Sequence, residues 1–223
     1  IPARSGSKGL KNKNFLKING IPLILWPINS AKKVKLIKKI VLSSDSKNIL
    51  NIAKNKKIDL NLRPKYLATD TASTFGVLKN ILKKKEYKNF KNIICLEPTS
   101  PFTNSKIIEK SIKLFIKLKV NSLITIAEAN QSSPNFLFEK DNKKILRPYL
   151  NSKKYNHLRR QDVKKTYFPD GSLYISNVAS LMKNQGFFGK KTAGYLVPKF
   201  YNLEIDDKTD LNIARSIAKY NNL

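Results

Sequence analysis

The sequence predicts an α/β protein built on a mainly parallel sheet, and two observations support this prediction. Short runs rich in Ile, Leu and Val alternate with longer amphipathic segments along most of the chain. Strands and helices that alternate in this way form βαβ units, whose helices connect parallel strands. The length of 223 residues and the 41% hydrophobic content fit one domain with its own core.

The elements are expected in the following order. Residues 1–3 resemble the end of a buried strand, and the Asn19-Gly20 turn leads into a helix over 22–34, whose first turn suits Pro22. Ser46 and its neighbours cap a second helix. Further helices are expected over 74–84, 105–117, 178–183 and 207–220. Strands are expected over 39–43, 58–62, 92–96, 122–127, 171–175, 192–197 and 201–205.

This alternation stops after Ala129. Residues 130–168 are polar, rich in Lys, Asn and Tyr, and have no clear helical period. A long irregular insertion in a compact domain usually serves as a lid, a binding loop or an arm between subunits. We therefore expect one domain over 1–223, with 130–168 as an inserted arm.

The net charge of +29 is typical of proteins that bind nucleic acid or an anionic membrane. However, the lysines are spread through every segment, and aromatic residues do not interleave with them as they do in nucleic-acid-binding surfaces. We therefore expect no nucleic-acid partner and assign the charge to steering an anionic small molecule. No run reaches the roughly 18 apolar residues of a membrane span, so a soluble protein without a membrane role is expected.

The single cysteine, Cys95, lies in an apolar run and cannot form an internal disulfide. We expect it in the core of a protein from a reducing cytoplasm. Because Ile1 is not Met and begins inside a predicted strand, we also expect the native N-terminus to lie upstream.

The stretch 1–14, IPARSGSKGLKNKN, makes the most specific chemical prediction. Its two glycines let the backbone turn sharply and approach a ligand closely. The amides of such a turn, with Arg4, Lys8 and Lys13 around them, would bind phosphate oxygens. The stretch is not a Walker A loop, since no Gly-Lys-Ser/Thr sequence closes it. A flexible surface turn is the alternative, but its position after a strand favours phosphate binding.

Acidic residues gather before the last helix, where Glu204, Asp206, Asp207 and Asp210 are four of the fifteen acids in the chain. In an extended segment Glu204 and Asp206 point to the same face. Two carboxylates on one face suit Mg²⁺ when phosphate oxygens complete its ligand shell. Asp207 and Asp210 fit the first turn of a helix, so we assign them to capping. Spacing alone leaves Glu204 and Asp206 open between a metal site and ordinary surface acids.

A third signal is the turn LEPTSP at residues 96–101, which follows another strand. Its prolines restrict the backbone, while Glu97, Thr99 and Ser100 offer polar groups where an α/β sheet binds its ligand. The same turn would equally serve as a rigid connection to a helix that Thr103 or Asn104 caps.

Five stretches of the sequence together resemble one family. They are IPARSGSKGLKNKN (1–14), RPKYLATDTAST (63–74), LEPTSP (96–101), FPDGSLYISN (168–177) and EIDDKTDL (204–211). Their order and spacing are similar to those of the CMP-N-acylneuraminate synthetases, also called acylneuraminate cytidylyltransferases, which are relatives of the CMP-Kdo synthetases. The resemblance covers almost the whole chain, and SKGL followed by KN favours the acylneuraminate branch.

The resemblance implies a Rossmann-like nucleotidyltransferase fold with helices on both faces of the sheet and an inserted arm that forms a homodimer. It also implies a cytoplasmic transferase of cell-surface polysaccharide biosynthesis that requires Mg²⁺. In this reaction the anomeric hydroxyl of a nonulosonic (sialic-type) acid attacks the α-phosphorus of CTP, giving the CMP-sugar and pyrophosphate. Mg²⁺ and cationic side chains would neutralise the charge that develops on the phosphate.

The resemblance further implies roles for individual residues. The nucleotide-binding positions are Arg4, Ser7, Lys13, Asn14 and Arg63. Lys8, a further cation of the opening loop, is added to them. The sugar-pocket positions are Thr74, Glu97, Tyr174, Phe187 and Phe188, together with Arg160, which would reach the sugar site of the partner subunit. Glu204 and Asp206 match the metal-binding carboxylates, and Arg4, Lys13 and Asp206 are expected to act in catalysis.

This sequence departs from the family pattern mainly on the sugar side. Glu97 stands where the family commonly has Gln, and Asp170 stands where it has Asn in the turn before the last strands. Phe136 falls near the position of a sugar-side lysine. The metal pair is usually two aspartates, and Glu204, longer by one methylene, is still expected to bind. N-acetylneuraminate, legionaminate and pseudaminate are therefore all candidate substrates.

Two other classes remain open. A CMP-Kdo synthetase or another sugar nucleotidyltransferase would keep the nucleotide loop and the metal pair but use a different sugar. The nucleotide and sugar that together release pyrophosphate would distinguish these enzymes. A non-enzymatic nucleic-acid binder would instead bind DNA or RNA with a steep salt dependence and show no turnover.

Overall fold

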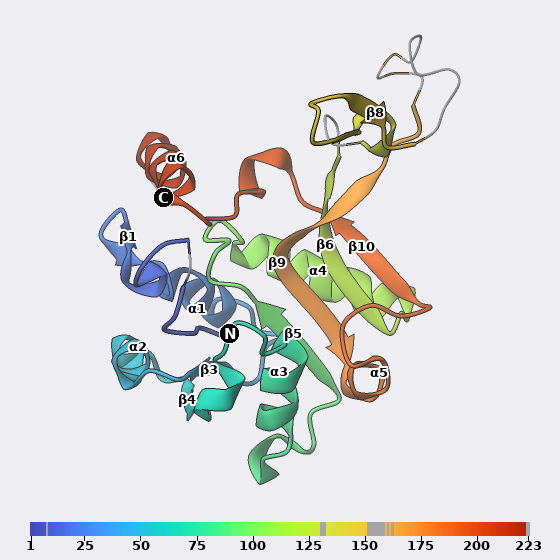
Figure 1. Ribbon diagram of the computed structural model, residues 1–223. Helices are drawn as coiled ribbons and strands as arrows, with labels where there is room; N and C mark the ends of the chain where they lie inside the picture. Colours follow the sequence, from blue (N-terminus) through green and yellow to red (C-terminus); the bar gives the residue numbers. More distant parts are fainter. Residues whose placement is uncertain (8, 130–132, 151–158, 160, 162, 222–223) are drawn as a thin grey trace.

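The computed structural model describes residues 1–7, 9–129, 133–150, 159, 161 and 163–221. Its central layer is a four-stranded sheet in the order β10-β6-β9-β5 (Figure 1). The strands span Asn92–Leu96 (β5), Ser122–Glu128 (β6), Tyr167–Asn177 (β9) and Thr192–Leu196 (β10). Strand β10 runs parallel to β6, whereas β9 runs antiparallel to both of its neighbours.

The predicted α/β fold is confirmed, and the sheet is mixed: β5, β6 and β10 run in one direction and β9 runs against them. The chain leaves the sheet along β6, passes through the inserted arm and returns directly along β9. Strands joined in this way pair as antiparallel neighbours, since no helix carries the chain back to the starting edge. Helix α5 (Val178–Asn184) follows β9, and β10 then pairs with the other side of β6.

A second, two-stranded parallel sheet consists of β3 (Val41–Ser44) and β4 (Asp59–Leu62). Helix α2 (Lys47–Ile52) connects the two strands, and the side chain of Ser46 caps it as expected. The N-terminal segment lies beside β3, because Ala3 N donates to Ser43 O at 2.8 Å. The loop that follows residue 3 therefore leaves from a strand-like position, in agreement with the sequence prediction.

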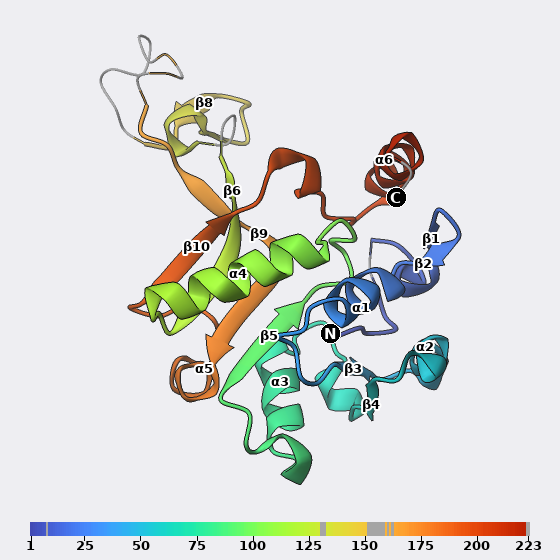
Figure 2. The same cartoon turned by 180° about the vertical axis from the view of Figure 1, so that it is seen from behind.

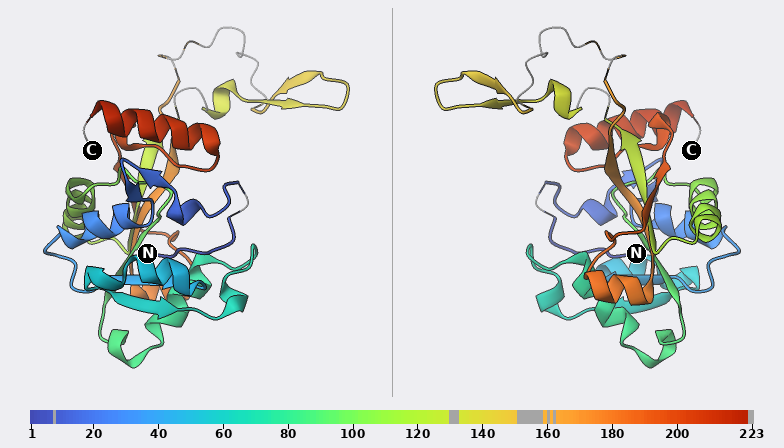
Figure 3. Two further views of the ribbon diagram at one scale, coloured as in Figure 1. Left: turned by 90° about the vertical axis from the view of Figure 1, so that its left-hand side faces the viewer. Right: turned by 90° about the vertical axis from the view of Figure 1, so that its right-hand side faces the viewer.

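Side chains of the four-stranded sheet alternate between two cores on its opposite faces. Leu123 and Ile175 belong to the core formed with α1 (Leu25–Lys32) and α4 (Ser105–Leu118). Ile124 and Cys95 belong to the core formed with α3 (Thr74–Leu82) and α5. Figures 2 and 3 show α4 on one side of the sheet and α5 on the other. The predicted helices on both faces and the predicted core position of Cys95 are confirmed.

A short hairpin precedes α1. Strands β1 (Lys17–Ile18) and β2 (Ile21–Pro22) pair antiparallel, with Asn19 at φ 46° and Gly20 at φ 76° in the turn between them. Positive φ at both turn positions is the geometry that Asn-Gly favours in two-residue hairpin turns. The predicted helix start at Pro22 is wrong, because this residue completes the hairpin and α1 begins only at Leu25.

The strand predicted over 201–205 does not form either. A 3-10 helix at Lys199–Tyr201 is followed by an extended segment, in which Ile205 N donates to Thr99 O at 2.8 Å. That bond ties the segment to the turn after β5 rather than to a strand. Helix α6 (Lys208–Tyr220) follows, and its start is a capping box made by Asp207 and Asp210. The capping role predicted for these two acids is confirmed.

Helix α6 packs against the N-terminal hairpin rather than against the main sheet. Ile18 and Leu23 from the hairpin region share one buried cluster with Ile205, Leu211 and Ala214. In Figure 1 the hairpin labelled β1 accordingly lies beside α6. This packing brings the acidic segment before α6 next to the basic loop that begins the chain.

The insertion extends from the sheet as an arm (Figures 1 and 3). Its described part holds a 3-10 helix at Pro134–Phe136 and a hairpin of β7 (Phe138–Lys140) and β8 (Leu146–Pro148). All residues of both strands are exposed. The large apolar side chains exposed in the described part of the arm are Leu137, Phe138, Ile145, Leu146, Tyr149, Leu150, Tyr167 and Phe168. Dimerisation through this arm stays a prediction.

No helix among the described residues is both long and apolar enough to cross a membrane.

Candidate active site

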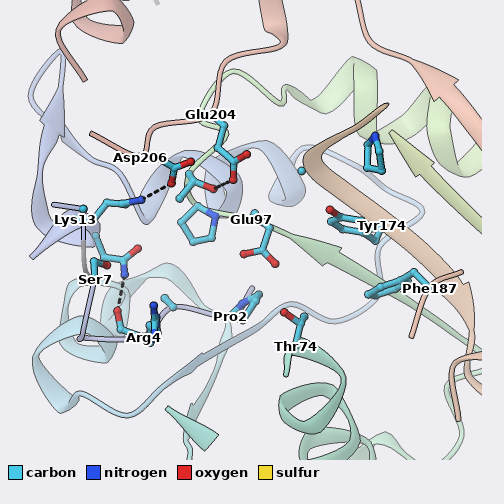
Figure 4. A pocket seen from close by; sticks show the side chains of 17 residues that line it. Pro2, Arg4, Ser7, Lys13, Thr74, Glu97, Tyr174, Phe187, Glu204 and Asp206 are labelled. Atoms are coloured by element: carbon cyan, nitrogen blue, oxygen red, sulfur yellow. Dashed lines mark hydrogen bonds and ion pairs between the residues drawn. The ribbon is translucent and has the colours of Figure 1, made fainter. Parts of the chain in front are cut away.

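A cavity of about 680 Å³ opens at the carboxyl end of β5, between the N-terminal loop and the segment before α6 (Figure 4). Sheets of this kind bind ligands beyond the carboxyl ends of their strands. Ten residues predicted from the sequence line it: Arg4, Ser7, Lys13, Asn14, Thr74, Glu97, Tyr174, Phe187, Glu204 and Asp206. The cavity therefore joins side chains from both ends of the chain.

The two ends of the chain meet through Lys13. Its Nζ donates to the backbone oxygen of Ile205 at 2.7 Å and to Asp206 Oδ1 at 2.9 Å. A Cβ added at Gly9 would collide with the backbone oxygen of Asp206. Glycine is needed at this position because the loop backbone passes directly against the acidic segment.

Hydrogen bonds hold the start of the loop in place. Asn14 Nδ2 donates to the backbone oxygen of Arg4 at 3.0 Å, and Arg4 itself pairs with Asp70 at 2.6 Å. Ser5 donates to Asp45 from both its backbone N, at 2.9 Å, and its hydroxyl. Burial would raise the pKa of Asp45, but the hydrogen bonds from Ser5 outweigh it and hold that pKa below its usual value. The loop is thus anchored on acidic side chains, with Arg4 directed at the cavity.

The acidic pair is held in the orientation that its spacing predicted. Ile205 is fully buried, so Glu204 and Asp206 on either side of it both reach the cavity. Thr99 Oγ1 donates to Glu204 Oε1 at 3.2 Å. Burial and then the charge of Asp206 raise the pKa of Glu204. A Cβ added at Gly171, whose φ is +77°, would lie 2.9 Å from Glu204 Oε2.

These two carboxylates fit a divalent cation. Burial is the largest cause of the raised pKa of Glu204 and repulsion from Asp206 the next, and a bound cation would relieve that repulsion. Among the described residues, no group of three or more His, Cys, Asp or Glu side chains could hold a metal ion. If Glu204 and Asp206 are the two ligands from the described residues, phosphate and water oxygens would complete the octahedron that Mg²⁺ prefers.

The other end of the cavity combines a carboxylate with aromatic rings. The ring centroids of Tyr174 and Phe187 lie 5.1 Å apart, and Thr74 lines the cavity close to them (Figure 4). Cys95 Sγ donates to Glu97 Oε1 at 3.4 Å. Burial raises the pKa of Glu97, and burial together with the charge of Glu97 raises the pKa of Tyr174 to about 12.

The structure does not bring every predicted residue to the cavity. Arg63 is only 6% exposed and does not line it, although its buried Nε has no hydrogen-bond partner among the described residues. Burial lowers the pKa of Arg63, with Asp45 opposing that effect. Phe188 is 59% exposed and also does not line the cavity. Lys8 and Arg160 lie outside the described residues.

Several residues of the site were missed by sequence reasoning. Asp45 and Asp70 anchor the loop, and Gly171 lies against Glu204. The role of Asp45 could have been predicted, because this residue directly follows β3 and α/β sheets bind their ligands beyond the carboxyl ends of their strands. The pairing of Asp70 with Arg4 joins residues 66 positions apart, and no local pattern indicates it.

The arrangement of the sheet and its helices defines a class of fold, that of the α/β nucleotidyltransferases. The structure superimposes with a TM-score of 0.71 on CMP:2-keto-3-deoxy-manno-octonic acid synthetase, which was solved in complex with CTP. The match covers 99% of this chain and 97% of that one at 14% sequence identity, so it shows the fold alone. The chain belongs to the cytidylyltransferase family, whose model matches residues 1–218. The family predicted from the five sequence stretches is thereby confirmed.

Curated relatives agree with this assignment. The N-acylneuraminate cytidylyltransferase of Escherichia coli O18:K1:H7 is 34% identical over 233 residues, which cover 100% of this chain and 52% of that protein. The CMP-N,N'-diacetyllegionaminic acid synthase of Campylobacter jejuni is 32% identical over 227 residues, covering 100% of this chain and 95% of that protein. The chain thus spans about half the length of the first relative and nearly all of the second.

Proposed function

We propose that this chain is a cytidylyltransferase that activates a nonulosonic acid of the sialic type with CTP, releasing pyrophosphate and a CMP-sugar. One observation supports this most strongly: the cations of the N-terminal loop and the two acids before α6 line the same cavity. Relatives named for N-acylneuraminate and N,N'-diacetyllegionaminic acid support the choice of sugar class.

The nucleotide end of the cavity is proposed to be the basic one. Arg4 and Lys13 would bind the phosphates, and the further nucleotide contacts would be Ser7, Lys8, Asn14 and Arg63. Lys13 reaches the cavity with only 11% of its side chain exposed, so its charge is weakly screened by water. A buried cation of this kind stabilises the negative charge that develops as the α-phosphorus is attacked.

Glu204 and Asp206 are proposed to hold Mg²⁺ beside the triphosphate. When bound there, the ion supplies positive charge against the phosphate oxygens and the leaving pyrophosphate. Thr99 keeps Glu204 directed at the cavity through its hydrogen bond, and Lys13 does the same for Asp206. Both carboxylates are thus held in place before any ligand arrives.

The sugar end is proposed to be formed by Thr74, Glu97, Tyr174 and Phe187, with Phe188 at its margin. Substrate bound there would present its anomeric hydroxyl to the α-phosphorus. Arg160, which lies outside the described residues, is proposed to reach the sugar site of the partner subunit. The apolar side chains exposed on the arm support a homodimer, since large exposed apolar surface marks a docking site. We propose a cytoplasmic enzyme whose CMP-sugar supplies cell-surface polysaccharide biosynthesis.

A pyrophosphate-release assay tests this function. The purified chain would be incubated with Mg²⁺, one nucleoside triphosphate and one sugar acid, and the product mass would be measured. CTP with a nine-carbon keto acid is expected to give a CMP-sugar, whereas UTP or GTP with hexose phosphates is expected to give nothing. Turnover with the eight-carbon acid Kdo in preference to every nine-carbon acid would favour the CMP-Kdo synthetase alternative. No turnover with CTP and any keto acid would refute the proposal.

A further inference from the structure

Glu97 lies in the cavity in an unusual electrostatic position. It follows directly after β5, and its carboxylate points into the space between Thr74, Tyr174 and the acidic pair (Figure 4). Its backbone is fixed on both sides, because Glu97 N donates to Ser172 O at 3.2 Å and Ser100 N donates to Glu97 O at 3.3 Å. The carboxylate is therefore held at the sugar end of the cavity by the sheet itself.

No cation in the described part of the chain forms an ion pair with this carboxylate. Among the described residues, the two cations that line the cavity are engaged elsewhere, Arg4 with Asp70 and Lys13 with Asp206. Arg63 and the N-terminal amino group also attract the charge of Glu97, but neither forms an ion pair with it. The hydrogen bond described for the Glu97 side chain comes from the thiol of Cys95 at 3.4 Å, and a thiol is a weak donor. A partly buried carboxylate that faces a cavity without an ion-pair partner is a natural contact for a ligand that carries positive charge.

The neighbouring side chains suit a positively charged group as well. Tyr174 and Phe187 lie with their ring centroids 5.1 Å apart at an interplanar angle of 32°, and both line the cavity beside Glu97. Aromatic faces next to a carboxylate form a common environment for ammonium and amidinium groups, because the rings attract cations and the carboxylate pairs with them. A neutral acylamino group would leave the charge of Glu97 uncompensated.

We infer that Glu97 is a specificity-determining residue that selects sugar acids bearing a positively charged nitrogen substituent, such as an amidine, in place of a neutral acylamino group. This inference rests on the proposed function, since it concerns the sugar end of the same cavity. A bound triphosphate and the carboxylate of the sugar add further negative charge nearby, which strengthens the demand for a cation beside Glu97.

A matched substrate pair isolates this charge. An acetamidino group has nearly the same shape as an acetamido group, but an NH₂⁺ replaces the carbonyl oxygen. The experiment measures kcat/KM for two nonulosonic acids that differ only in this substituent, placed at carbon 5 or carbon 7, with CTP in excess. The wild-type chain is expected to prefer the amidine by about tenfold at one of these positions, the typical difference between charged and neutral hydrogen bonds.

Glu97→Gln keeps the shape of the side chain and removes its charge, so the preference should fall to near unity or reverse while the KM for CTP stays unchanged. Glu109→Gln makes the same chemical change at an exposed position on α4, where Glu109 pairs with Lys113, and should behave as wild type. Turnover of the acetamido substrate by Glu97→Gln shows that this variant is folded.

Two results would overturn the inference. A wild-type chain that uses the acetamido acid as well as or better than both amidines contradicts it, and so does an amidine preference that survives in Glu97→Gln. Either result leaves the proposed cytidylyltransferase function standing. Absence of turnover with every sugar acid refutes the proposed function and removes the basis of the inference with it.

Discussion

Replacing Asp206 by Asn should separate the chemistry of the site from the stability of the fold. The substitution preserves the shape of the side chain and an oxygen that still accepts the hydrogen bond of Lys13 Nζ, which is 2.9 Å long. What it removes is one of the two charges proposed to hold Mg²⁺. Removing one group that stabilises transition-state charge typically costs about 100- to 1000-fold in kcat, and we expect a loss of that size.

The expected effect on stability is small. The side chain of Asp206 is 71% exposed, although its partner Lys13 is largely buried. The charge of Lys13 keeps two hydrogen-bond acceptors in the variant, the backbone oxygen of Ile205 and the amide oxygen of the new Asn, so we expect a cost of about 1 kcal/mol. In a chain of this length a loss of 1 kcal/mol lowers the melting temperature by about 2–4 °C. A large loss of activity should therefore accompany an almost unchanged melting curve.

The assay is pyrophosphate release over a Mg²⁺ titration, with thermal melting measured on the same samples. Asp207→Asn is the matched control, since it makes the same chemical change one residue further on. Asp207 caps α6 instead of lining the cavity, and Asn caps helices as well as Asp does. Asp206→Asn should require more Mg²⁺ and turn over slowly, while Asp207→Asn should match wild type. Near-wild-type turnover by Asp206→Asn at every Mg²⁺ concentration would refute the assignment.

Three further outcomes are expected. Gly9→Ala should lower the free energy of unfolding by about 1–3 kcal/mol and weaken CTP binding, because the added Cβ would collide with the backbone of Asp206. Gly6→Ala is the control, since an added Cβ there would meet no atom; thermal melting and CTP titration should match wild type. Burial raises the pKa of Glu97, so the native state loses stability as pH rises from the unfolded-state pKa to the higher native value. Glu97→Gln should therefore melt above wild type near about pH 8 and lose that gain near about pH 4; equal melting temperatures at both pH values would contradict this. Leu146→Lys places a charge on the exposed face of the arm and should make the proposed homodimer monomeric in light scattering. Ile116→Lys makes a similar change at an equally exposed position on α4 and should leave the protein dimeric. A monomeric wild-type protein would contradict the proposed dimer.

Much of the fold followed from local sequence signals. The strands at 92–96 and 122–127 and the helix caps at Ser46 and Asp207 depend on nearby residues, and the structure has them as predicted. The direction of β9 was not predictable, because apolar strand residues look alike in parallel and antiparallel pairs. Its direction depends on the path of the inserted arm, which carries no regular pattern.

The candidate site likewise has some features that local sequence indicates and others that it does not. The basic loop and the acidic segment stood out because glycines, cations and carboxylates were dense there, and the structure brings Lys13 to Asp206. The contacts of Arg4 with Asp70 and of Gly171 with Glu204 were not predictable. Each joins residues far apart in sequence, so only the packing of the whole chain determines it.

The orientation of the acidic pair depends on an apolar residue. Ile205 is fully buried in the cluster that α6 shares with the N-terminal hairpin, and its two backbone groups are both occupied. Its N donates to Thr99 O at 2.8 Å, and its O accepts from Lys13 Nζ at 2.7 Å. Because neighbouring side chains of an extended segment point to opposite sides, burying Ile205 turns Glu204 and Asp206 toward the cavity together. The hydrophobic cluster under α6 therefore determines the geometry of the proposed metal ligands, although none of its side chains would touch the metal.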